Sequence, residues 1–201
     1  VNIKKNHSIN LMPAIDFLMK AVDLKPTDLD RISVAQGPGS YTGLRVAVAT
    51  AKTLAYTLNI ELVGVSSLYA LAAAADFDGL VVPVIDARRN NVYAGFYKDG
   101  QSLKDDQHMN FADVLEAVKD EESVMFVGEV ANFSNQIAES LPQAKVLSVL
   151  PSAYAIGKRG QELQPVDVDS FVPSYLKRVE AEENWLKTHI ENPSANYVNR
   201  I

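Results

Sequence analysis

Apolar and polar residues follow two different periods along the chain, and each period predicts one kind of secondary structure. Apolar residues spaced three and four apart predict helices over residues 8–22, 41–58, 67–75, 111–119, 134–140 and 153–162. Short apolar or alternating runs predict strands over residues 31–35, 61–64, 80–86, 91–97 and 124–127. The order strand, long helix, strand near the start is typical of a parallel α/β layer, and the strand at 91–97 is expected to pair with the one at 80–86.

A change in composition near residues 76–80 divides the chain into two predicted lobes. We expect a first lobe at 1–78, a second lobe at 79–170 and an irregular, polar C-terminal tail at 171–201. The formal net charge is −6, and the acidic excess lies in the middle, where residues 61–170 carry 8 basic and 17 acidic side chains. Strong independent binding of nucleic acid needs clustered Lys and Arg, so this charge argues against it.

Composition narrows the class of protein further. Of 201 residues, 47% are hydrophobic and 22% are charged, as in ordinary globular proteins, and none is cysteine, which excludes a disulfide framework and a cysteine nucleophile. No apolar run reaches the roughly 18–20 residues of a membrane span, and no signal peptide opens the sequence, so we expect a cytoplasmic protein. The sequence begins at Val1 rather than Met, in a segment resembling the end of a strand, so we also expect a fragment or a processed product.

A glycine-rich segment, Gln36–Arg45, lies between the first predicted strand and the long helix. Glycine permits positive φ and close backbone approach, and the N–H groups at a helix start can hold an anion. The segment has neither the Gly-Lys-Ser/Thr of a Walker A loop nor the Gly-x-Gly-x-x-Gly spacing of a dinucleotide site. A tight turn without ligand and a phosphate site both stay open. The candidate anion-binding residues are Gly37, Gly39, Ser40, Thr42 and Gly43.

The order of residues in and around this segment carries a family resemblance. The sequence GPGSYTGLR, followed by AVATAKTLAY and VGVSSLYALA, resembles the TsaB (YeaZ) family of bacterial proteins, and Asp86-Ala87-Arg88-Arg89 matches it as well. The resemblance implies an α/β, two-lobed actin-like or sugar-kinase-like ATPase (ASKHA) fold and a role in making threonylcarbamoyladenosine next to the tRNA anticodon. Members usually begin with two strands that this sequence lacks, so we expect a first lobe truncated at its start.

The same resemblance bears on whether the chain is an enzyme. TsaB resembles TsaD, the catalytic subunit of the same system, which carries a metal-binding His-x-x-x-His motif on the corresponding helix. The two ligand positions would be Ser67 and Leu71 here, and leucine cannot bind a metal. The histidines His7, His108 and His189 are far apart, and the Gly-x-Ser-x-Gly nucleophile motif is absent. We therefore expect no catalytic residue, no metal site and a chain that is not itself an enzyme.

Two helices of the first lobe have apolar residues on more than one face. Simple burial within the lobe explains this pattern, and so does a helix-to-helix interface. The resemblance implies the interface, because TsaB-like subunits pair there with a TsaD-like subunit, or with themselves when alone. The candidate interface residues are Leu11, Met12, Ile15, Met19, Ala47, Ala51, Leu54 and Leu58. Either Met12→Asp or Ala51→Arg is expected to abolish pairing and leave the fold intact.

Two hypotheses about function follow. In the first, the chain is a non-catalytic scaffold that activates a TsaD-like paralogue, with a TsaE-like ATPase subunit as a further partner, tRNA contacted only indirectly and no membrane involved. It predicts no cofactor of the chain's own, while ATP at a subunit interface stays open, and Arg88 and Arg89 are expected to make structural or subunit contacts. In the second, the chain is an actin-like-fold ATPase or small-molecule kinase that binds phosphate at Gly37–Gly43.

Overall fold

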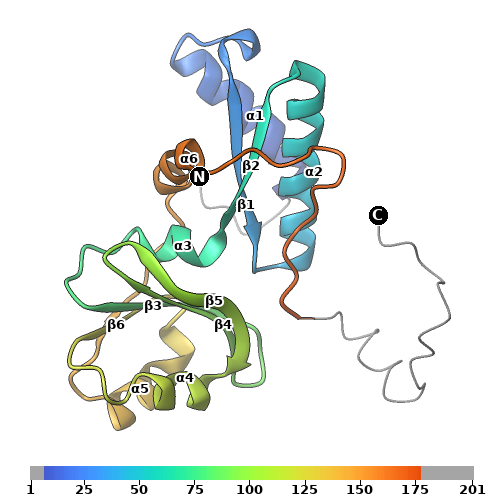
Figure 1. Ribbon diagram of the computed structural model, residues 1–201. Coiled ribbons are helices and arrows are strands. Elements are labelled where there is room, and N and C mark those ends of the chain that lie inside the picture. The colour runs from blue at the N-terminus through green and yellow to red at the C-terminus, as the bar shows by residue number, and fades with distance from the viewer. Residues whose placement is uncertain (1–6, 178–201) are drawn as a thin grey trace, which may run out of the picture.

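The computed structural model describes residues 7–177 and contains two β-sheets with helices packed around them (Figure 1). The first sheet has two parallel strands, β1 (Arg31–Gly37) and β2 (Glu61–Ser66). The helix α2 (Tyr41–Leu58) makes the crossover between them. This strand–helix–strand unit confirms the parallel layer predicted from the sequence.

The second sheet has five strands in the order β5-β4-β3-β6-β7. The strands β3 and β4 are antiparallel neighbours, as predicted, while β6 and β7 continue the sheet in parallel with β3. The strand bounds are β3 (Leu80–Asp86), β4 (Asn91–Lys98), β5 (Gln101–Asn110), β6 (Val124–Gly128) and β7 (Lys145–Leu147).

The sequence does not predict the two edge strands, β5 and β7. Most residues of β5 are polar and exposed, and an edge strand that faces solvent needs no apolar alternation, so the usual signal is missing. The strand β7 has only three residues, all exposed, which is too short for a period to be seen. The turn between β4 and β5 carries positive φ at Asp99 (51°) and Gly100 (72°), which suits a two-residue hairpin.

The helices lie where the sequence predicts them. The remaining helices are α1 (His7–Ala21), α3 (Ser67–Ala72), α4 (Phe111–Ala117), α5 (Ser134–Ser140) and α6 (Ala153–Glu162), with single 3-10 turns η1 (Pro26–Asp28) and η2 (Ala131–Phe133). At the start of α2 the Ser40 hydroxyl accepts a hydrogen bond from the Gly43 N–H (3.4 Å). The helix ends before Asn59, which has a left-handed φ of 53°.

Three clusters of buried apolar side chains hold these elements together. The largest lies between the second sheet and its helices, where the Phe111 ring centroid is 4.3 Å from that of Phe133. Another lies between α2 and the first sheet. The third joins α3 to the second sheet, through Leu71 packed with Val81 and Val127. Because α3 also follows directly on β2, it forms the junction between the two sheets.

The helix α6 packs on the first sheet, although the sequence assigned residues 79–170 to the second lobe. The Arg31 guanidinium donates hydrogen bonds to the carbonyl oxygens of Gly160 (2.6 Å) and Leu163 (3.2 Å), which fixes the end of α6 against β1. Phe171, further along, belongs to the buried cluster of α2 and the first sheet. Residues 153–171 therefore lie with the first sheet, and the division into lobes as such stays a prediction.

The described part of the predicted tail returns to the first sheet. The Ser174 N–H donates a hydrogen bond to the Gln36 carbonyl oxygen (2.7 Å), which ties this segment to the end of β1. Residues 178–201 lie outside the described residues. None of the described helices combines the length and the apolar character needed to cross a bilayer.

Candidate functional site

The glycine-rich loop joins the end of β1 to the start of α2. Gly37 has a φ of +125°, a conformation that favours glycine, and a side chain there would collide with the carbonyl oxygen of Ser174. The close approach of these two backbone segments is sufficient reason for glycine at this position. Gly37 and the exposed Thr42 are absent from the lining of the cavity beside the loop, whereas Gly39, Ser40 and Gly43 line it.

That cavity, of about 260 Å³, lies where the loop meets α3, the end of β3 and the segment before α6. It brings together two features that are distant in the sequence, the glycine loop and the positions Ser67 and Leu71. The other lining residues are Pro38, Leu44, Ile85, Glu129, Val149, Leu150 and Pro151. We refer to this space as the loop cavity.

The chemistry of the loop cavity suits neither a metal ion nor a phosphate. Leu71 is only 2% exposed and belongs to the buried cluster of α3, so it offers no ligand. The ionisable group of the lining is Glu129, whose carboxylate accepts a hydrogen bond from the Asp86 N–H (2.9 Å) and whose charge opposes an anion. Between residues 7 and 177 there is no group of three or more His, Asp or Glu that could hold a metal.

The histidines do not change this conclusion. His108 lies on β5, with its ring centroid 5.4 Å from that of Tyr93, and it is not part of the cavity lining. The side chain of His7 and all of His189 lie outside what the structure describes.

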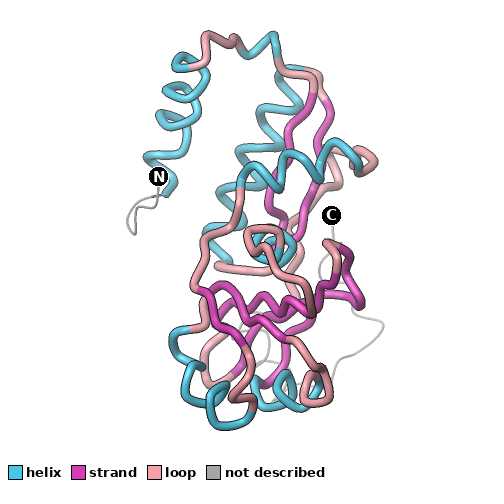
Figure 2. Tube along the Cα trace, turned by 90° about the vertical axis from the view of Figure 1, so that its left-hand side faces the viewer, coloured by secondary structure: helices cyan, strands magenta, loops and turns pink. Residues whose placement is uncertain are grey.

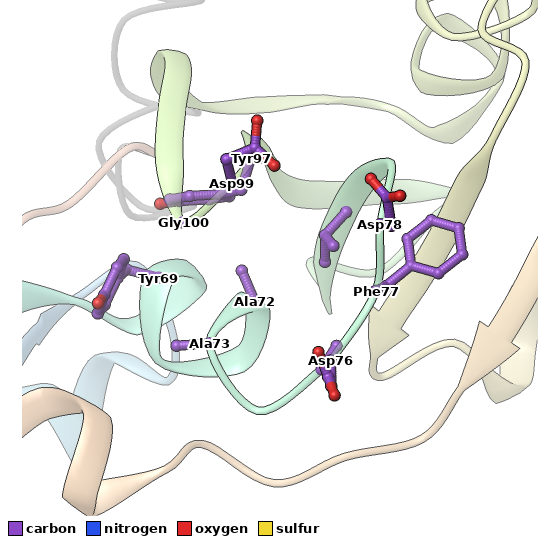
Figure 3. Close-up of a pocket in the computed structure, with 11 residues that line it drawn as sticks. Tyr69, Ala72, Ala73, Asp76, Phe77, Asp78, Tyr97, Asp99 and Gly100 are labelled. Atoms are coloured by element: carbon purple, nitrogen blue, oxygen red, sulfur yellow. The ribbon is translucent and has the colours of Figure 1, made fainter.

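A larger cavity, of about 510 Å³, lies beside α3 and the turn after β4 (Figure 3). Three carboxylates line it, those of Asp76, Asp78 and Asp99, together with the rings of Tyr69 and Phe77. This negative charge argues against an anionic ligand here as well. The two rings already carry cations of the chain, since the Lys145 ammonium lies 5.2 Å from the Phe77 centroid and the Arg159 guanidinium 5.6 Å from that of Tyr69.

A small polar cluster joins the two sheets at the start of α3. The Ser66 hydroxyl donates to an Asp106 carboxylate oxygen (2.5 Å) and accepts from the N–H groups of Leu68 and Tyr69, so it links β5 to the helix start. The Tyr97 hydroxyl donates to the other Asp106 oxygen (3.1 Å). Burial raises the pKa of Asp106 above its ordinary value, against the effect of both hydrogen bonds, and burial also raises the pKa of Tyr97.

The second candidate site is the outer face of α1. No residue of α1 from Ile9 onward is buried, and α1 contributes to none of the three apolar clusters. It contacts the rest of the chain mainly through α2, and Figure 2 shows it along the outer side of the molecule. Phe17 is 69% exposed and Met12 47% exposed. The exposed apolar residues of this helix, which we refer to together as the α1 face, are Ile9, Met12, Phe17 and Leu18. Ile9, Met12 and Phe17 share one side of the helix, and Leu18 lies opposite Ile9.

The predicted interface residues fall into three groups. Met12 is exposed, as an interface residue must be. The half-buried group comprises Leu11, Ile15, Met19, Ala47, Leu54 and Leu58. Ala51 was placed in the interface wrongly, because it is only 5% exposed and packs between α2 and the first sheet of its own chain. The small-residue stripe of α2 is explained by close packing of the helix on the sheet.

The sequence-based list also omitted three residues of the α1 face: Ile9, Phe17 and Leu18. Ile9 and Phe17 lie eight residues apart, a spacing that places them on one side of a helix. This spacing was available in the sequence. Periodicity shows that α1 has apolar residues on more than one side. It does not show which side packs against the rest of the chain.

The arginine pair lies in the turn between β3 and β4. Arg88, Arg89 and Asn90 all have left-handed φ, at 67°, 53° and 58°. The Arg88 N–H donates to an Asp86 carboxylate oxygen (2.7 Å), and the Asn91 side chain donates to the carbonyl oxygens of both arginines. These bonds hold the turn in an unusual backbone conformation. The role of the two guanidinium groups stays a prediction.

Comparisons with known proteins agree with the geometry. The family model "TsaD: tRNA N6-adenosine threonylcarbamoyltransferase" matches residues 2–185. The tRNA threonylcarbamoyladenosine biosynthesis protein TsaB of Bacillus subtilis is 41% identical over 197 residues, which covers 92% of this chain and 86% of that protein. A Pseudomonas aeruginosa protein described as similar to peptidase YeaZ superposes with a TM-score of 0.71 at 25% identity, covering 87% and 86% of the two chains. A structure of YeaZ from the same organism has a TM-score of 0.69 at 23% identity, covering 88% and 87%, and supports the fold alone.

The fold and the site together define the class of protein. This is a mixed α/β protein of the actin-like type, with a mostly apolar cavity between the glycine loop and α3 and with an exposed apolar helix, α1, packed on α2. The chain belongs to the TsaB (YeaZ) family, within the wider group that the TsaD model describes. The expectations of family and of fold type made from the sequence are confirmed.

Proposed function

We propose that the chain is a non-catalytic subunit of the system that adds threonylcarbamoyl to the tRNA adenosine next to the anticodon. It acts by pairing with a catalytic TsaD-like paralogue and stabilising the active form of that subunit. The name of the Bacillus subtilis relative supports the biosynthetic role. The observation that carries the mode of action is the α1 face, four large apolar side chains exposed on one helix.

Exposed apolar surface of this kind favours association in water. Covering each of these side chains contributes on the order of 1–2 kcal/mol, in proportion to the area removed from water. A stable interface buries roughly 1,600 Å² in total, so the α1 face needs neighbouring surface. The exposed side of α2 offers it, since Tyr41 and Tyr56 are both exposed there. Tyrosine and methionine are common at adaptable interfaces.

The absence of catalysis by this chain is argued from the loop cavity. Leu71 is buried and apolar at a position where the TsaD-like paralogue carries a histidine, and Glu129 places negative charge where a phosphate would sit. The hydroxyls of Ser40 and Ser67 line this cavity with Glu129, but among the described residues the Ser40 hydroxyl is bonded to the Gly43 N–H and the Glu129 carboxylate to the Asp86 N–H rather than to each other. The chain therefore contributes surface and stability to the complex, and the partner contributes the reaction.

Further parts of the proposal concern the other components. A TsaE-like ATPase subunit completes the system, and the chain works in the cytoplasm. The acidic charge of residues 61–170 favours a tRNA that contacts the partner rather than this chain. Without the paralogue, two copies of the chain pair through the same α1 face. The chain has no cofactor of its own, and any ATP lies at a subunit interface.

The test is reconstitution of tRNA modification from purified subunits. Threonylcarbamoyladenosine formed on tRNA is measured by mass spectrometry with the TsaD-like and TsaE-like subunits, with and without this chain. We expect product only when the chain is present, and we expect Met12→Asp to abolish it while Ser67→Ala leaves it unchanged. Equal product without the chain contradicts the scaffold role. Loss of product in Ser67→Ala, in a variant that folds normally, contradicts the non-catalytic role.

In the alternative hypothesis, the chain is an ATPase or kinase that binds phosphate at Gly37–Gly43. It is favoured by the start of α2, where backbone N–H groups follow the glycines, and opposed by Glu129. A nucleotide that binds the native state raises the melting temperature by mass action. An increase of several degrees with millimolar ATP and magnesium, without any partner, would favour this alternative.

A further inference from the structure

The turn between β3 and β4 has arginine at positions where the backbone favours glycine or asparagine. The N–H of Asn91 donates to the carbonyl oxygen of Arg88 (3.0 Å), so Arg89 and Asn90 are the two central residues of the turn. Positive φ at both central positions is the type I′ geometry, for which Asn-Gly is the preferred sequence. Arg88, which precedes them, also has a left-handed φ of 67°. This conformation is unfavourable for arginine, so the turn itself gives no reason for these side chains.

Polar side chains hold the backbone of this turn, Arg88–Asn91, which we refer to as the arginine turn. The Asp86 carboxylate accepts a hydrogen bond from the Arg88 N–H (2.7 Å), and the Asn90 side-chain oxygen accepts one from the Gln136 amide of α5 (2.8 Å). Arg88 is exposed, and no other described residue forms a hydrogen bond or an ion pair with its guanidinium. Strained residues that are held in this way are typical of binding sites. The arginine turn therefore presents a cation on a fixed backbone.

The arginine turn adjoins the loop cavity. Glu129, which lines the cavity, accepts a hydrogen bond from the N–H of Asp86, the residue that also holds the arginine turn. The glycine loop lines the same cavity with Ser40, and the next residue, Tyr41, packs against Tyr175 with their ring centroids 5.2 Å apart. Tyr175 lies two residues before the end of the described part of the chain. That part of the chain therefore ends close to the same cavity.

The residues that follow carry the complementary charge. Three glutamates lie in the stretch Glu180–Glu183, in which only Ala181 is uncharged. Glu180 is five residues beyond Tyr175 and Glu183 is eight, so an extended chain reaches at most about 18 Å and 29 Å from that ring. This reach is sufficient to pass a cavity of about 260 Å³. Like charges so close in sequence repel one another, and pairing with a guanidinium offsets that repulsion.

From these observations we propose that the acidic stretch Glu180–Glu183 docks on the arginine turn of the same chain. The C-terminal segment then crosses the mouth of the loop cavity and covers it. Arginine pairs with carboxylates in a defined, often bidentate geometry, which suits a turn with a fixed backbone. A nucleic acid suits the turn less well, because its binding depends on many phosphate contacts and residues 61–170 are acidic. This inference does not depend on the scaffold role.

The test is carbodiimide coupling of the full chain, a reaction that joins a lysine ammonium to a carboxylate in contact with it and leaves arginine unreacted. The variant Arg88→Lys keeps the charge of the turn, and we expect mass spectrometry of its digest to find position 88 linked to one of the three glutamates. Lys98, an exposed lysine at the other end of β4, is the internal control and is expected to remain unlinked to them. High salt is expected to lower the yield of the link several-fold, because it screens exposed charge pairs.

Two further measurements complete the test. Mixing isotope-labelled and unlabelled Arg88→Lys shows whether the link forms within one chain, and we expect no hybrid product. Arg88→Gly is expected to have a melting temperature at or above that of the wild type, because glycine adopts a φ of 67° without strain and an exposed ion pair contributes little to stability.

Four results overturn the inference. They are the absence of a link from position 88 to the three glutamates, an equal yield of links from Lys98, a link that forms only between chains, and a melting temperature of Arg88→Gly several degrees below that of the wild type. The last result would show that the arginine is present to stabilise the turn itself.

Discussion

Two helices with similar apolar content, α4 and α1, differ in where their apolar side chains lie. In α4 the side chains of Phe111, Val114 and Leu115 are buried against the second sheet. In α1, which is twice as long, no residue from Ile9 onward is buried. The apolar residues of α4 stabilise the chain itself, whereas those of α1 contribute little to its stability and are available to another surface. Mutations on the two helices are therefore expected to have separable effects.

The largest effect is expected for Phe111→Ala. This ring is fully buried against Phe126 and Phe133, so its removal leaves a cavity and lowers the free energy of unfolding by about 3–5 kcal/mol. The matched change on α1 is Phe17→Ala. Because Phe17 is exposed, we expect this change to alter the free energy of unfolding by less than about 0.5 kcal/mol. Urea denaturation followed by circular dichroism measures both values. Equal losses in the two variants would remove the distinction between the helices.

The second prediction concerns two alanines of α2. Ala51→Arg forces a long charged side chain into the space between α2 and the first sheet, and we expect a loss of more than about 3 kcal/mol. Ala49→Arg, on the exposed side of the same helix, is expected to be near neutral. This replaces the expectation from the sequence that Ala51→Arg leaves the fold intact. Thermal melting of both variants is the measurement. A stable, natively folded Ala51→Arg would show that Ala51 does not pack between α2 and the first sheet.

The third prediction concerns Met12→Asp on the α1 face. A charge in an apolar interface is expected to weaken binding to the TsaD-like subunit by at least about 2 kcal/mol, which is roughly 30-fold. Stability is expected to change by less than about 0.5 kcal/mol, because Met12 is exposed. Isothermal titration calorimetry gives the affinity. The control is Asn135→Asp, which adds the same charge on the exposed side of α5. Equal affinity in the two variants would exclude the α1 face from the interface.

The smallest effect concerns pH and the cluster between the sheets. Burial raises the pKa of Asp106 in the folded chain above its ordinary value of 3.8, so the folded state holds this proton more tightly than the unfolded state. The stabilisation is complete below the unfolded pKa and is lost as pH rises through the folded pKa. The melting temperature is expected to fall as pH rises above about 4, and Asp106→Asn is expected to make this fall smaller. Asp105→Asn removes only the lesser cause of the raised pKa of Asp106, the repulsion by the neighbouring carboxylate, so we expect it to change the fall less than Asp106→Asn does. An identical pH profile in wild type and Asp106→Asn would contradict the shift.

Local signals in the sequence were sufficient for most elements of the fold. The bounds of α2 follow from Ser40, which caps its first turn, and from Asn59, which adopts the left-handed conformation after its last residue. The strands β3 and β6 were found because their residues are apolar and buried on both faces. The edge strand β5 was missed because solvent, rather than a core, covers most of it.

The loop cavity and the interface residues were harder to predict, because they depend on which elements of the chain pack against one another. Periodicity identified Ala51 as part of an apolar stripe, but it does not tell whether a sheet of the same chain or a partner covers that stripe. The loop cavity brings Gly39 next to Ser67 and to Val149, which are far apart in sequence. The glycine-rich pattern marked Gly39, the family resemblance marked Ser67, and no local pattern marked Val149. The contact among them follows only from the packing of α3 at the junction of the sheets.

The most direct test of the scaffold role is the mass of the chain in solution, measured by light scattering alone and after mixing with a TsaD-like subunit. We expect the chain alone to be a homodimer of about twice 22.0 kDa. On mixing, we expect the homodimer to convert to a complex with one copy of each subunit, and we expect no conversion for Met12→Asp. If the mixture retains the separate masses of its components, the α1 face does not pair with the catalytic paralogue.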